Sequence, residues 1–138
     1  MDLQNYIVKW MLEKMTQIEG VAQEILKQLQ YYARNVSEKV DAAKEENAKA
    51  CLKAIKMNSP KGRRNGEYAK GWRIKRTSKR LVIHNATNYQ LTHLLEHGHV
   101  LRKGGRNVGA TDERPHIRPA EEVAVRNFLK DVERAIET

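Results

Sequence analysis

One long stretch at the start of the chain limits the folds open to it. From Asp2 to Asn58 the sequence has no proline and a single glycine, Gly20, so little in it opposes a continuous helix. Its apolar residues recur in alternating steps of four and three, a heptad spacing typical of a helix face that packs against another helix. We call this face the heptad seam; it comprises Met11, Met15, Ile18, Ala22, Ile25, Leu29, Tyr32 and Val36, and after a slip Val40, Ala43 and Cys51.

The length of this helix has a further consequence. Pro60 disfavours a helical Ser59, so the helix is predicted to end there. At about 1.5 Å per residue, a helix of about 35 residues is more than about 50 Å long, which exceeds the diameter of a small domain. One interpretation is that the seam packs on the sheet of its own chain. We favour the other, in which part of it contacts another subunit or a second helix. Residues 1–19 are predicted to be an N-terminal extension or a separate helix, with a break near Gly20.

The positive charge is concentrated in one short segment. The chain has a net charge of +9, and residues 59–80 hold nine basic groups against one acidic group, or +8 of that total. Such a cluster favours an anionic partner, either nucleic acid or an acidic protein surface, although it is also compatible with a solvated face. We call it the basic patch; it comprises Lys61, Arg63, Arg64, Lys70, Arg73, Lys75, Arg76, Lys79 and Arg80.

The middle of the chain predicts a small antiparallel sheet. "SPKGRRNGEY" is a loop, and the alternating segments "GWRIKRT" and "RLVIHNA" follow it. Trp72 and Ile74 share one face of the first strand, and Leu81 and Ile83 share one face of the second. The hairpin is therefore expected to have one buried face and one basic face.

A short helix is predicted from Thr87 to His97. Thr87 and Gln90 have the spacing of a capping box, and Gly98 suits the end of the helix. Its buried stripe is predicted to consist of Leu91, Leu94 and Leu95. Residues 102–114 are predicted to form a flexible loop, and a last helix follows Pro119. The loop residues expected to make contacts are Arg102, Lys103, Gly104, Gly105 and Arg106.

Together these elements predict a single α+β domain over residues 1–138. A long N-terminal helix and a C-terminal helix pack on a small antiparallel β-sheet with one short helix. No apolar run approaches the roughly 18 residues of a membrane span, so no membrane partner is expected. A single cysteine, Cys51, excludes an internal disulfide and fits a small core residue of the long helix.

The segment "LTHLLEHGHV" contains the spelling of an inverted zinc-peptidase motif. His93 and His97 are four residues apart and share a helical face with Glu96. That face is predicted to point away from the local core, opposite the leucines. The helix stops at Gly98, and no clear third ligand follows, although His99 and His116 remain candidates. We therefore expect no metal, no cofactor and no catalytic residue, and we assign these histidines to polar surface or subunit contacts. Glu96 is expected either to pair with an arginine or to cap a backbone turn.

Four fragments in a fixed order resemble a known family. They are "SPKGRRNGEYAKGW", "VIHNATNYQLTHLLEHGHV", "GG" and "PHIRPAEE". Their order and spacing resemble the tailed-bacteriophage head–tail joining and tail-completion family, small neck proteins often labelled minor structural or tail-component proteins. The resemblance covers roughly residues 20–138. The residues that carry it, all with an expected structural role, are Ser59, Pro60, Gly66, Tyr68, Trp72, Asn85, Tyr89, Leu95, Glu96, Gly98, Pro115, Pro119 and Ala120.

The resemblance implies a non-enzymatic virion assembly protein. It would form a homo-oligomeric ring, expected to be a hexamer, at the virion neck, after assembly in the bacterial host cytoplasm. Its partners would be the portal-side connector and the tail-tube or tail-terminator proteins, and the basic patch could contact the passing DNA.

An alternative function comes from the basic patch alone. The patch could serve a nucleic-acid-binding module in which Tyr68 and Trp72 stack on bases. Against this alternative, Trp72 fits the buried side of the predicted hairpin.

Overall fold

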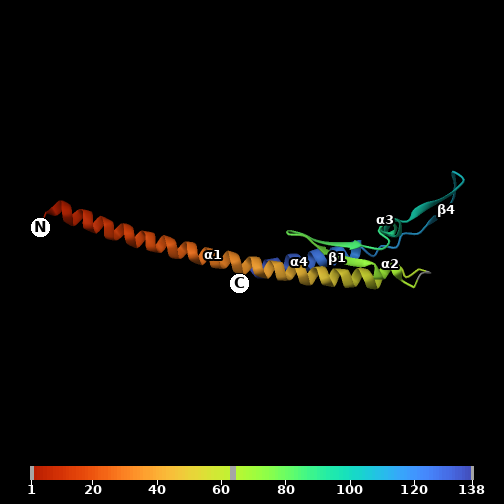
Figure 1. The fold of residues 1–138 in the computed structure, drawn as a ribbon, viewed down its shortest axis with the longest axis horizontal. Helices are drawn as coiled ribbons and strands as arrows, with labels where there is room; N and C mark the ends of the chain where they lie inside the picture. The colour runs from red at the N-terminus through yellow and green to blue at the C-terminus, as the bar shows by residue number, and fades with distance from the viewer. Residues whose placement is uncertain (1, 63–64, 138) are drawn as a thin grey trace. The chain divides into compact units, whose positions relative to one another are not determined.

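The computed structural model describes residues 2–62 and 65–137 (Figure 1). Its class is α+β, as predicted, with long N-terminal and C-terminal helices and four short strands. The strands form two sheets of two antiparallel strands each. The elements in chain order are α1 (Leu3–Asn58), α2 (Glu67–Lys70), β1 (Trp72–Arg76), β2 (Leu81–Asn85), α3 (Gln90–His97), β3 (His99–Lys103), β4 (Arg106–Thr111) and α4 (Arg118–Glu137).

The chain divides into two compact units, Met1–Lys39 and Val40–Thr138. In the first unit, the described residues from Leu3 onward all belong to α1, and residues 2–34 are exposed. The helix passes through Gly20 without a break, so residues 3–19 continue into the same helix. That the chain forms a single domain stays a prediction.

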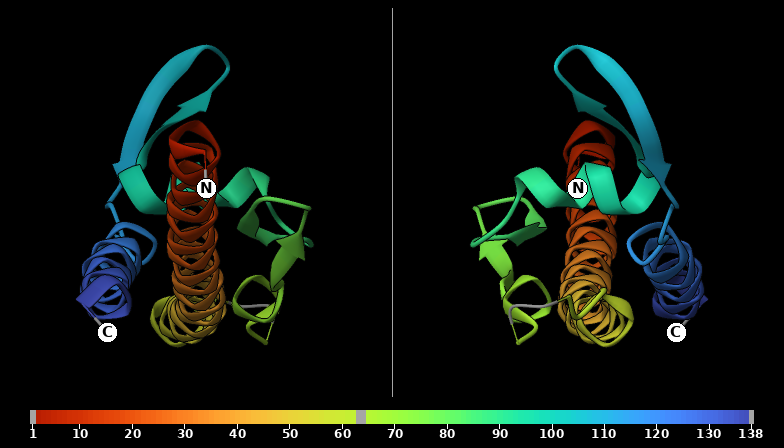
Figure 2. Two further views of the ribbon diagram at one scale, coloured as in Figure 1. Left: turned by 90° about the vertical axis from the view of Figure 1, so that its left-hand side faces the viewer. Right: turned by 90° about the vertical axis from the view of Figure 1, so that its right-hand side faces the viewer.

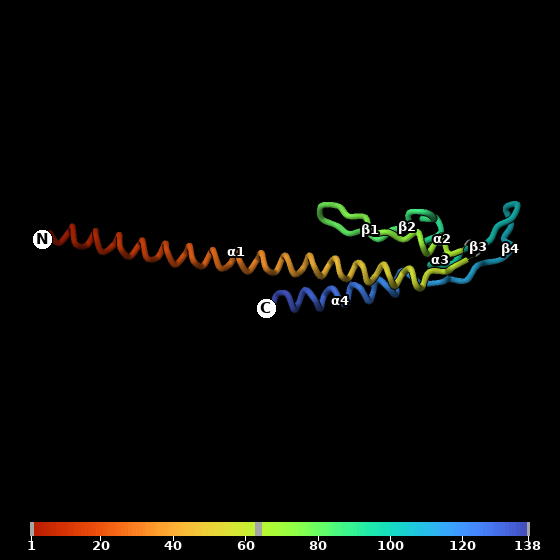
Figure 3. Tube along the Cα trace, turned by 60° about the horizontal axis from the view of Figure 1, so that its bottom comes forward, coloured from red at the N-terminus to blue at the C-terminus, as the bar shows by residue number. Residues whose placement is uncertain are grey.

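The second unit has a small core built on the last turns of α1. Cys51 and Ile55 of α1 are buried together with Tyr68, Trp72 and Ala120. Burial raises the pKa of the Cys51 thiol. Helix α4 runs beside this part of α1, and the β1–β2 hairpin lies on another side of it (Figures 2 and 3). The seam therefore contacts a second helix of its own chain from Ala43 onward, as Asn47 confirms by donating to the Asp131 carboxylate at 2.8 Å.

The predicted β1–β2 hairpin is confirmed. Ile74 pairs with Ile83, and Trp72 pairs with Asn85 at the open end. Trp72 is buried, Ile74 and Ile83 are half-buried, and Arg73 and Lys75 on the opposite face are exposed. The sheet thus has the one buried and one basic face that its alternation predicted.

Helix α3 differs from its prediction at the start and in its buried face. It begins at Gln90, and its N-cap residue Tyr89 makes no side-chain capping bond. The predicted Thr87–Gln90 capping box is wrong because the Thr87 amide donates to the Asn85 carboxamide instead. The leucine stripe is also only partly right. Leu95 packs against the core and Leu94 is half-buried, but Leu91 is exposed.

The segment predicted as a structureless loop over residues 102–114 contains most of a second hairpin. Strands β3 and β4 pair antiparallel, with His99 opposite Thr111 and Lys103 opposite Arg106. Gly104 and Gly105 form the two-residue turn with φ values of 57° and 78°. Positive φ at both positions is the requirement of a type I′ hairpin turn, so this glycine pair is a turn signal that the sequence analysis missed.

No helix in the part of the chain that the structure describes combines the length and the apolar character needed to cross a membrane.

The core predicts a clear difference between two neighbouring apolar residues of α1. Ile55 is 2 % exposed and Met57 is 69 % exposed. Ile55→Ala leaves a cavity and should lower the free energy of unfolding by about 2–5 kcal/mol. Met57→Ala, the matched control, should change it by less than about 0.5 kcal/mol. Chemical denaturation of the two variants measures both values, and equal effects would place the core elsewhere.

Candidate functional site

The buried carboxylate of Glu96 connects α3 to the start of α4. Its Oε2 accepts hydrogen bonds from the backbone N–H groups of His116 at 2.9 Å and Ile117 at 3.0 Å, and its Oε1 accepts one from Arg118 at 2.9 Å. The first amides of a helix lack partners within the helix and form its positive end. Glu96 supplies that missing acceptor from another helix, so one side chain fixes where α4 begins.

This arrangement corrects the predicted orientation of the H-x-x-E-H segment. Glu96 was expected on a face that points away from the core, but it is only 7 % exposed. His93 and His97 of the same segment are exposed, as expected of polar surface residues. Glu96 therefore points inward because three backbone amides of the α4 start satisfy its charge.

The hydrogen bonds also set the pKa of Glu96. Burial alone raises this pKa, but the amides of His116, Arg118 and Ile117 and the charge of His116 outweigh burial, so the pKa of Glu96 is lowered. A carboxylate with several N–H donors commonly behaves in this way. Glu96 is therefore ionised at neutral pH, when its bonds to α4 are strongest.

A second buried group, His116, joins Tyr68 to the same junction. The Tyr68 hydroxyl lies 2.8 Å from His116 Nε2, and His116 Nδ1 lies 2.7 Å from the carbonyl oxygen of Arg114. Burial, with a smaller effect of the Glu96 charge, raises the pKa of Tyr68, so its hydroxyl keeps its proton. The Arg114 carbonyl oxygen can only accept, so a proton is assigned to His116 Nδ1, which donates to it. His116 is 1 % exposed, Tyr68 6 % and Glu96 7 %, so this Tyr68–His116–Glu96 cluster is largely shielded from solvent.

Ser59 and Trp72 tie the end of α1 to β1. The Trp72 indole N–H donates to Ser59 Oγ at 2.9 Å, and Ser59 Oγ donates to the Ile55 carbonyl at 2.6 Å. The rings of Tyr68 and Trp72 meet edge to face with centroids 5.7 Å apart. Such pairs add to the stability gained from burial. The Ser-Pro at the end of α1 is therefore used for its hydroxyl as well as for stopping the helix.

Asn85 organises the chain between α2 and α3. Its Nδ2 donates to the Tyr68 carbonyl at 2.8 Å, and its Oδ1 accepts from the backbone amides of Thr87 at 3.2 Å and Asn88 at 2.8 Å. Asparagine suits such a turn because its side chain both donates and accepts. The asparagine at the end of β2 thus holds three segments together.

Two glycines allow a close approach of backbone segments. Gly98 has φ 68°, and a Cβ there would lie 2.5 Å from the Thr111 carbonyl oxygen. A Cβ on Gly71 would overlap with Thr87 Oγ1. Gly98 carries both a left-handed backbone and a steric constraint, which explains a glycine between α3 and β3. Gly71 has only the steric one.

The remaining motif residues have structural surroundings. Gly66 has φ 74° and precedes α2, and Pro60 begins the loop after α1. Pro119 lies in the first turn of α4, where a proline is tolerated. Ala120 is buried in the core. Tyr89 and Pro115 are exposed, and the structure gives no reason for their residue types.

The structure places the basic patch along several elements of the second unit. Lys61 follows α1, Lys70 ends α2, Arg73 and Lys75 lie on β1, and Lys79 and Arg80 lie in the turn before β2; these side chains are exposed. Arg76, also on β1, forms a bidentate ion pair with Glu45, with distances of 3.1 Å and 2.8 Å. Arg63 and Arg64 lie outside the described residues.

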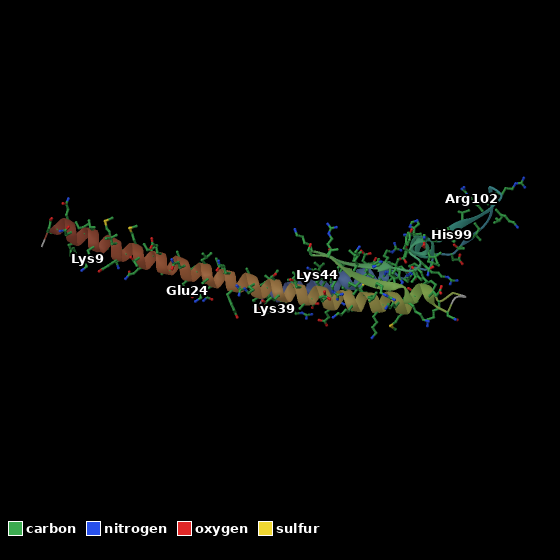
Figure 4. All side chains as sticks on the ribbon, in the orientation of Figure 1. Lys9, Glu24, Lys39, Lys44, His99 and Arg102 are labelled. Carbon is green, nitrogen blue, oxygen red and sulfur yellow. The ribbon has the colours of Figure 1, made fainter. Side chains whose placement is uncertain are left out.

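The glycine turn presents its charges at the tip of the second hairpin. Arg102 and Lys103 lie on β3, Arg106 on β4, and all are exposed with Gly104 and Gly105 between them. Figure 4 shows Arg102 pointing away from the hairpin, while His99 lies at its base. His99 Nδ1 is 2.9 Å from the Thr111 hydroxyl, a bond that closes the base of the hairpin.

The histidines of the H-x-x-E-H segment were considered as metal ligands. The rings of His93 and His97 lie with centroids 4.8 Å apart. Within residues 2–62 and 65–137, no three His, Cys, Asp or Glu side chains gather as metal ligands would.

The sequence did not reveal the role of one member of the Tyr68–His116–Glu96 cluster. His116 was named only as a candidate ligand, and its actual role joins Tyr68 to the start of α4. Its signal was the "PHIRP" context, in which the histidine is enclosed by two prolines just before a helix. Within the described residues, every buried side-chain nitrogen or oxygen has a hydrogen-bond partner. The arrangement is therefore one that holds segments in place.

Comparison with protein families gives one match. The HK97-gp10-like family model, described as "Bacteriophage HK97-gp10, putative tail-component", matches residues 23–98, more than half of the chain. The chain belongs to this family. Membership supports a structural or assembly role in a bacteriophage, in agreement with the resemblance drawn from the sequence motifs. The searches of curated proteins and of solved structures gave no match.

The HK97-gp10-like match covers part of the site only. It spans most of α1, the β1–β2 hairpin and α3, and ends at Gly98. Ser59, Tyr68, Asn85 and Glu96 lie inside it. His116 and the start of α4, to which Tyr68 and Glu96 are hydrogen-bonded, lie beyond it. The second hairpin also lies outside the matched segment.

The lowered pKa of Glu96 leads to a pH-dependent prediction. Glu96→Gln removes the charge and sets an amide N–H₂ against N–H donors, so it should lower the free energy of unfolding by about 1–3 kcal/mol at neutral pH. Since the folded-state pKa lies below the ordinary value, the benefit is complete above that value and is lost as the pH falls through the folded-state pKa. Urea unfolding at about pH 7 and about pH 3 measures the difference, which should shrink in acid.

The matched control for this prediction is Glu133→Gln, an exposed carboxylate on α4, the helix whose start Glu96 caps. It should leave stability nearly unchanged at both pH values. A Glu96→Gln chain as stable as the parent at neutral pH would show that the cap on α4 is unimportant.

Proposed function

We propose that the chain is a non-enzymatic virion assembly protein that forms a ring of identical subunits, six by the family resemblance, at the phage neck. Family membership supports a structural role. The observation that carries the assembly role is the β3–β4 hairpin, in which residues 100–111 are all exposed although they include Val100, Leu101 and Val108. A two-stranded hairpin without packing is only marginally stable in water, so this one needs a partner surface.

The hairpin suits a contact between subunits. It extends away from the other elements of its unit (Figures 1 and 3). A closed ring requires that one face of each subunit meets a different face of the next. A projecting element that docks on a neighbour meets this requirement. The portal-side connector and the tail-tube or tail-terminator proteins are the proposed partners above and below the ring.

The basic patch is proposed to contact acidic partners or the DNA that passes through the ring lumen. Six of its members are exposed and form no ion pair with another residue that the structure describes: Lys61, Lys70, Arg73, Lys75, Lys79 and Arg80. The alternative of a sequence-independent module that stacks bases is weaker. Its two aromatic residues, Tyr68 and Trp72, are 6 % and 3 % exposed and hydrogen-bonded inside the core. Contacts with phosphate groups do not need these rings.

Excision of the hairpin tests its role in assembly. His99 and Thr111 lie opposite each other at its base, so Asn-Gly in place of residues 100–110 can close the chain with a tight turn. We expect a folded protein whose melting temperature stays within about 4 °C of the parent. Its self-association, measured by sedimentation velocity, should be lost or strongly weakened.

The excision has two outcomes that contradict the proposal. An excised chain that no longer melts cooperatively would make the hairpin part of the fold. An excised chain that assembles like the parent would exclude the hairpin as an interface. Gly104→Asn, which keeps a residue suited to positive φ, is the control and should assemble normally.

The DNA contact is tested with charge-neutral variants. Lys75→Gln, Lys79→Gln and Arg80→Gln together should weaken binding of duplex DNA and reduce the slope of log affinity against log salt by about 0.9 for each lost phosphate contact. The matched control, Lys9→Gln, Lys27→Gln and Lys53→Gln on α1, removes the same charge elsewhere. If both sets of substitutions weaken DNA binding equally, the affinity depends on the total charge of the chain and not on the basic patch.

A further inference from the structure

The first unit presents one apolar face along a single helix. With heptad positions lettered a to g, the heptad seam within this unit occupies positions a and d, and Val8 extends it by one step toward the N-terminus. The residues at position a are Val8, Met15, Ala22, Leu29 and Val36, and those at d are Met11, Ile18, Ile25 and Tyr32.

This face is exposed in the single chain. The large side chains at a and d from Val8 to Leu29 are between 51 % and 68 % exposed. The unit consists of one helix, so it has no second element of its own to cover them. Figure 4 shows side chains along this part of α1, among them Lys9 and Glu24, extending outward from the helix. A continuous exposed apolar face of this kind indicates an interaction surface.

The flanking positions widen the face. Ile7 and Val21 occupy position g, and Leu12 and Leu26 occupy position e, and all four are at least 47 % exposed. In a two-stranded coiled coil these positions commonly carry Glu and Lys. Apolar residues at a, d, e and g together make a broader stripe, which suits a helix with a neighbour on each side.

The two charged flanking residues determine the orientation of a neighbour. In a parallel, in-register pair, position g of one helix lies beside position e five residues further along the other. This places Lys14 beside Glu19 of the second copy, Ile7 beside Leu12, and Val21 beside Leu26. Every pair is then matched in charge or in apolar character.

An antiparallel pair lacks this complementarity. It sets g against g and e against e. Position e holds no cation among Leu12, Glu19, Leu26 and Ala33, and position g holds no anion between Ile7 and Asn35. Lys14 would then never face an anion and Glu19 would never face a cation, whatever the register, which favours the parallel arrangement.

We infer that residues 7–32 of α1 form a parallel, in-register coiled coil with the same residues of further copies of this chain. This inference rests on the proposed function and deepens it, because it names the partner and orientation of one subunit contact. The g flank of each helix meets the e flank of the next, so two different faces are in contact, as a ring requires. Both apolar flanks and the Lys14–Glu19 pair are used.

Cysteine cross-linking tests the orientation. In a parallel, in-register bundle, identical a or d residues of neighbouring copies face each other, so Met11→Cys and Leu29→Cys should each form disulfide-linked dimers on their own. In an antiparallel bundle with these residues opposed, only a mixture of the two variants would cross-link. The parent chain, whose Cys51 is buried, and Tyr31→Cys, an exposed position off the seam, are controls and should stay unlinked. Cross-linking only in the mixture, or none in any variant, overturns the inference.

A charge exchange tests the pairing of Lys14 with Glu19. Lys14→Glu or Glu19→Lys alone sets like charges together and should weaken self-association about two- to fivefold. The double variant Lys14→Glu, Glu19→Lys restores opposite charges and should return the dissociation constant to the parent value. A double variant no tighter than either single one overturns the pairing. Circular dichroism verifies that all three stay helical.

A final comparison separates this inference from the proposed ring. Ile25→Asp places a charge on the seam, and Tyr31→Asp places the same charge off it. If Ile25→Asp assembles like Tyr31→Asp, the coiled coil is wrong, while a ring held by the β3–β4 hairpin stands. If Ile25→Asp is monomeric and the hairpin-excised chain still assembles, the coiled coil stands and the hairpin interface is wrong. Loss of assembly in both supports both contacts.

Discussion

The second unit depends on how the start of α4 is held. Three backbone amides there donate to a single carboxylate, Glu96, which comes from α3. His116, whose backbone amide is the first of the three, also connects this helix start to Tyr68 and so to the aromatic core. A helix start that lacks a side-chain cap of its own gains both hydrogen bonds and a favourable charge from this residue. Without the Glu96 carboxylate, far fewer hydrogen bonds would connect α3, α4 and the core at the end of α1.

Much of this fold follows from local sequence patterns. The end of α1 before Pro60, the β1–β2 hairpin and the α+β class were predicted because proline and alternation act over a few residues. A backbone cap was one of two alternatives predicted for Glu96, but its inward orientation and the segment that it caps were not predictable in the same way. A glutamate on a short helix has the character of a surface residue. Only the structure shows that this one accepts hydrogen bonds from backbone amides that begin twenty residues later in the chain. Leu91 was wrongly predicted to be buried for the converse reason, since apolar character does not say how much a small core can cover.

The second hairpin shows another limit of the sequence. Gly104 and Gly105 have the chemistry of a two-residue turn, but their flanking strands alternate weakly and bury nothing. Periodicity detects a face that is buried within the chain, and residues 99–111 have none. The heptad seam has the opposite difficulty, because its apolar pattern is clear but does not say what covers it. Its pattern was clear, but only the structure separates the part that packs on α4, from Ala43 onward, from the part that is exposed.

Each two-stranded sheet also has consequences at its outer edges. In β3 and β4 the backbone groups that do not face the partner strand can pair with any other strand that approaches. The exposed apolar side chains of Val100, Leu101 and Val108 would stabilise such pairing. Arg102, Lys103 and Arg106 lie among them, and their repulsion discourages random stacking between copies at high concentration. The positive charges at the tip of this hairpin therefore act against aggregation through its exposed strand edges.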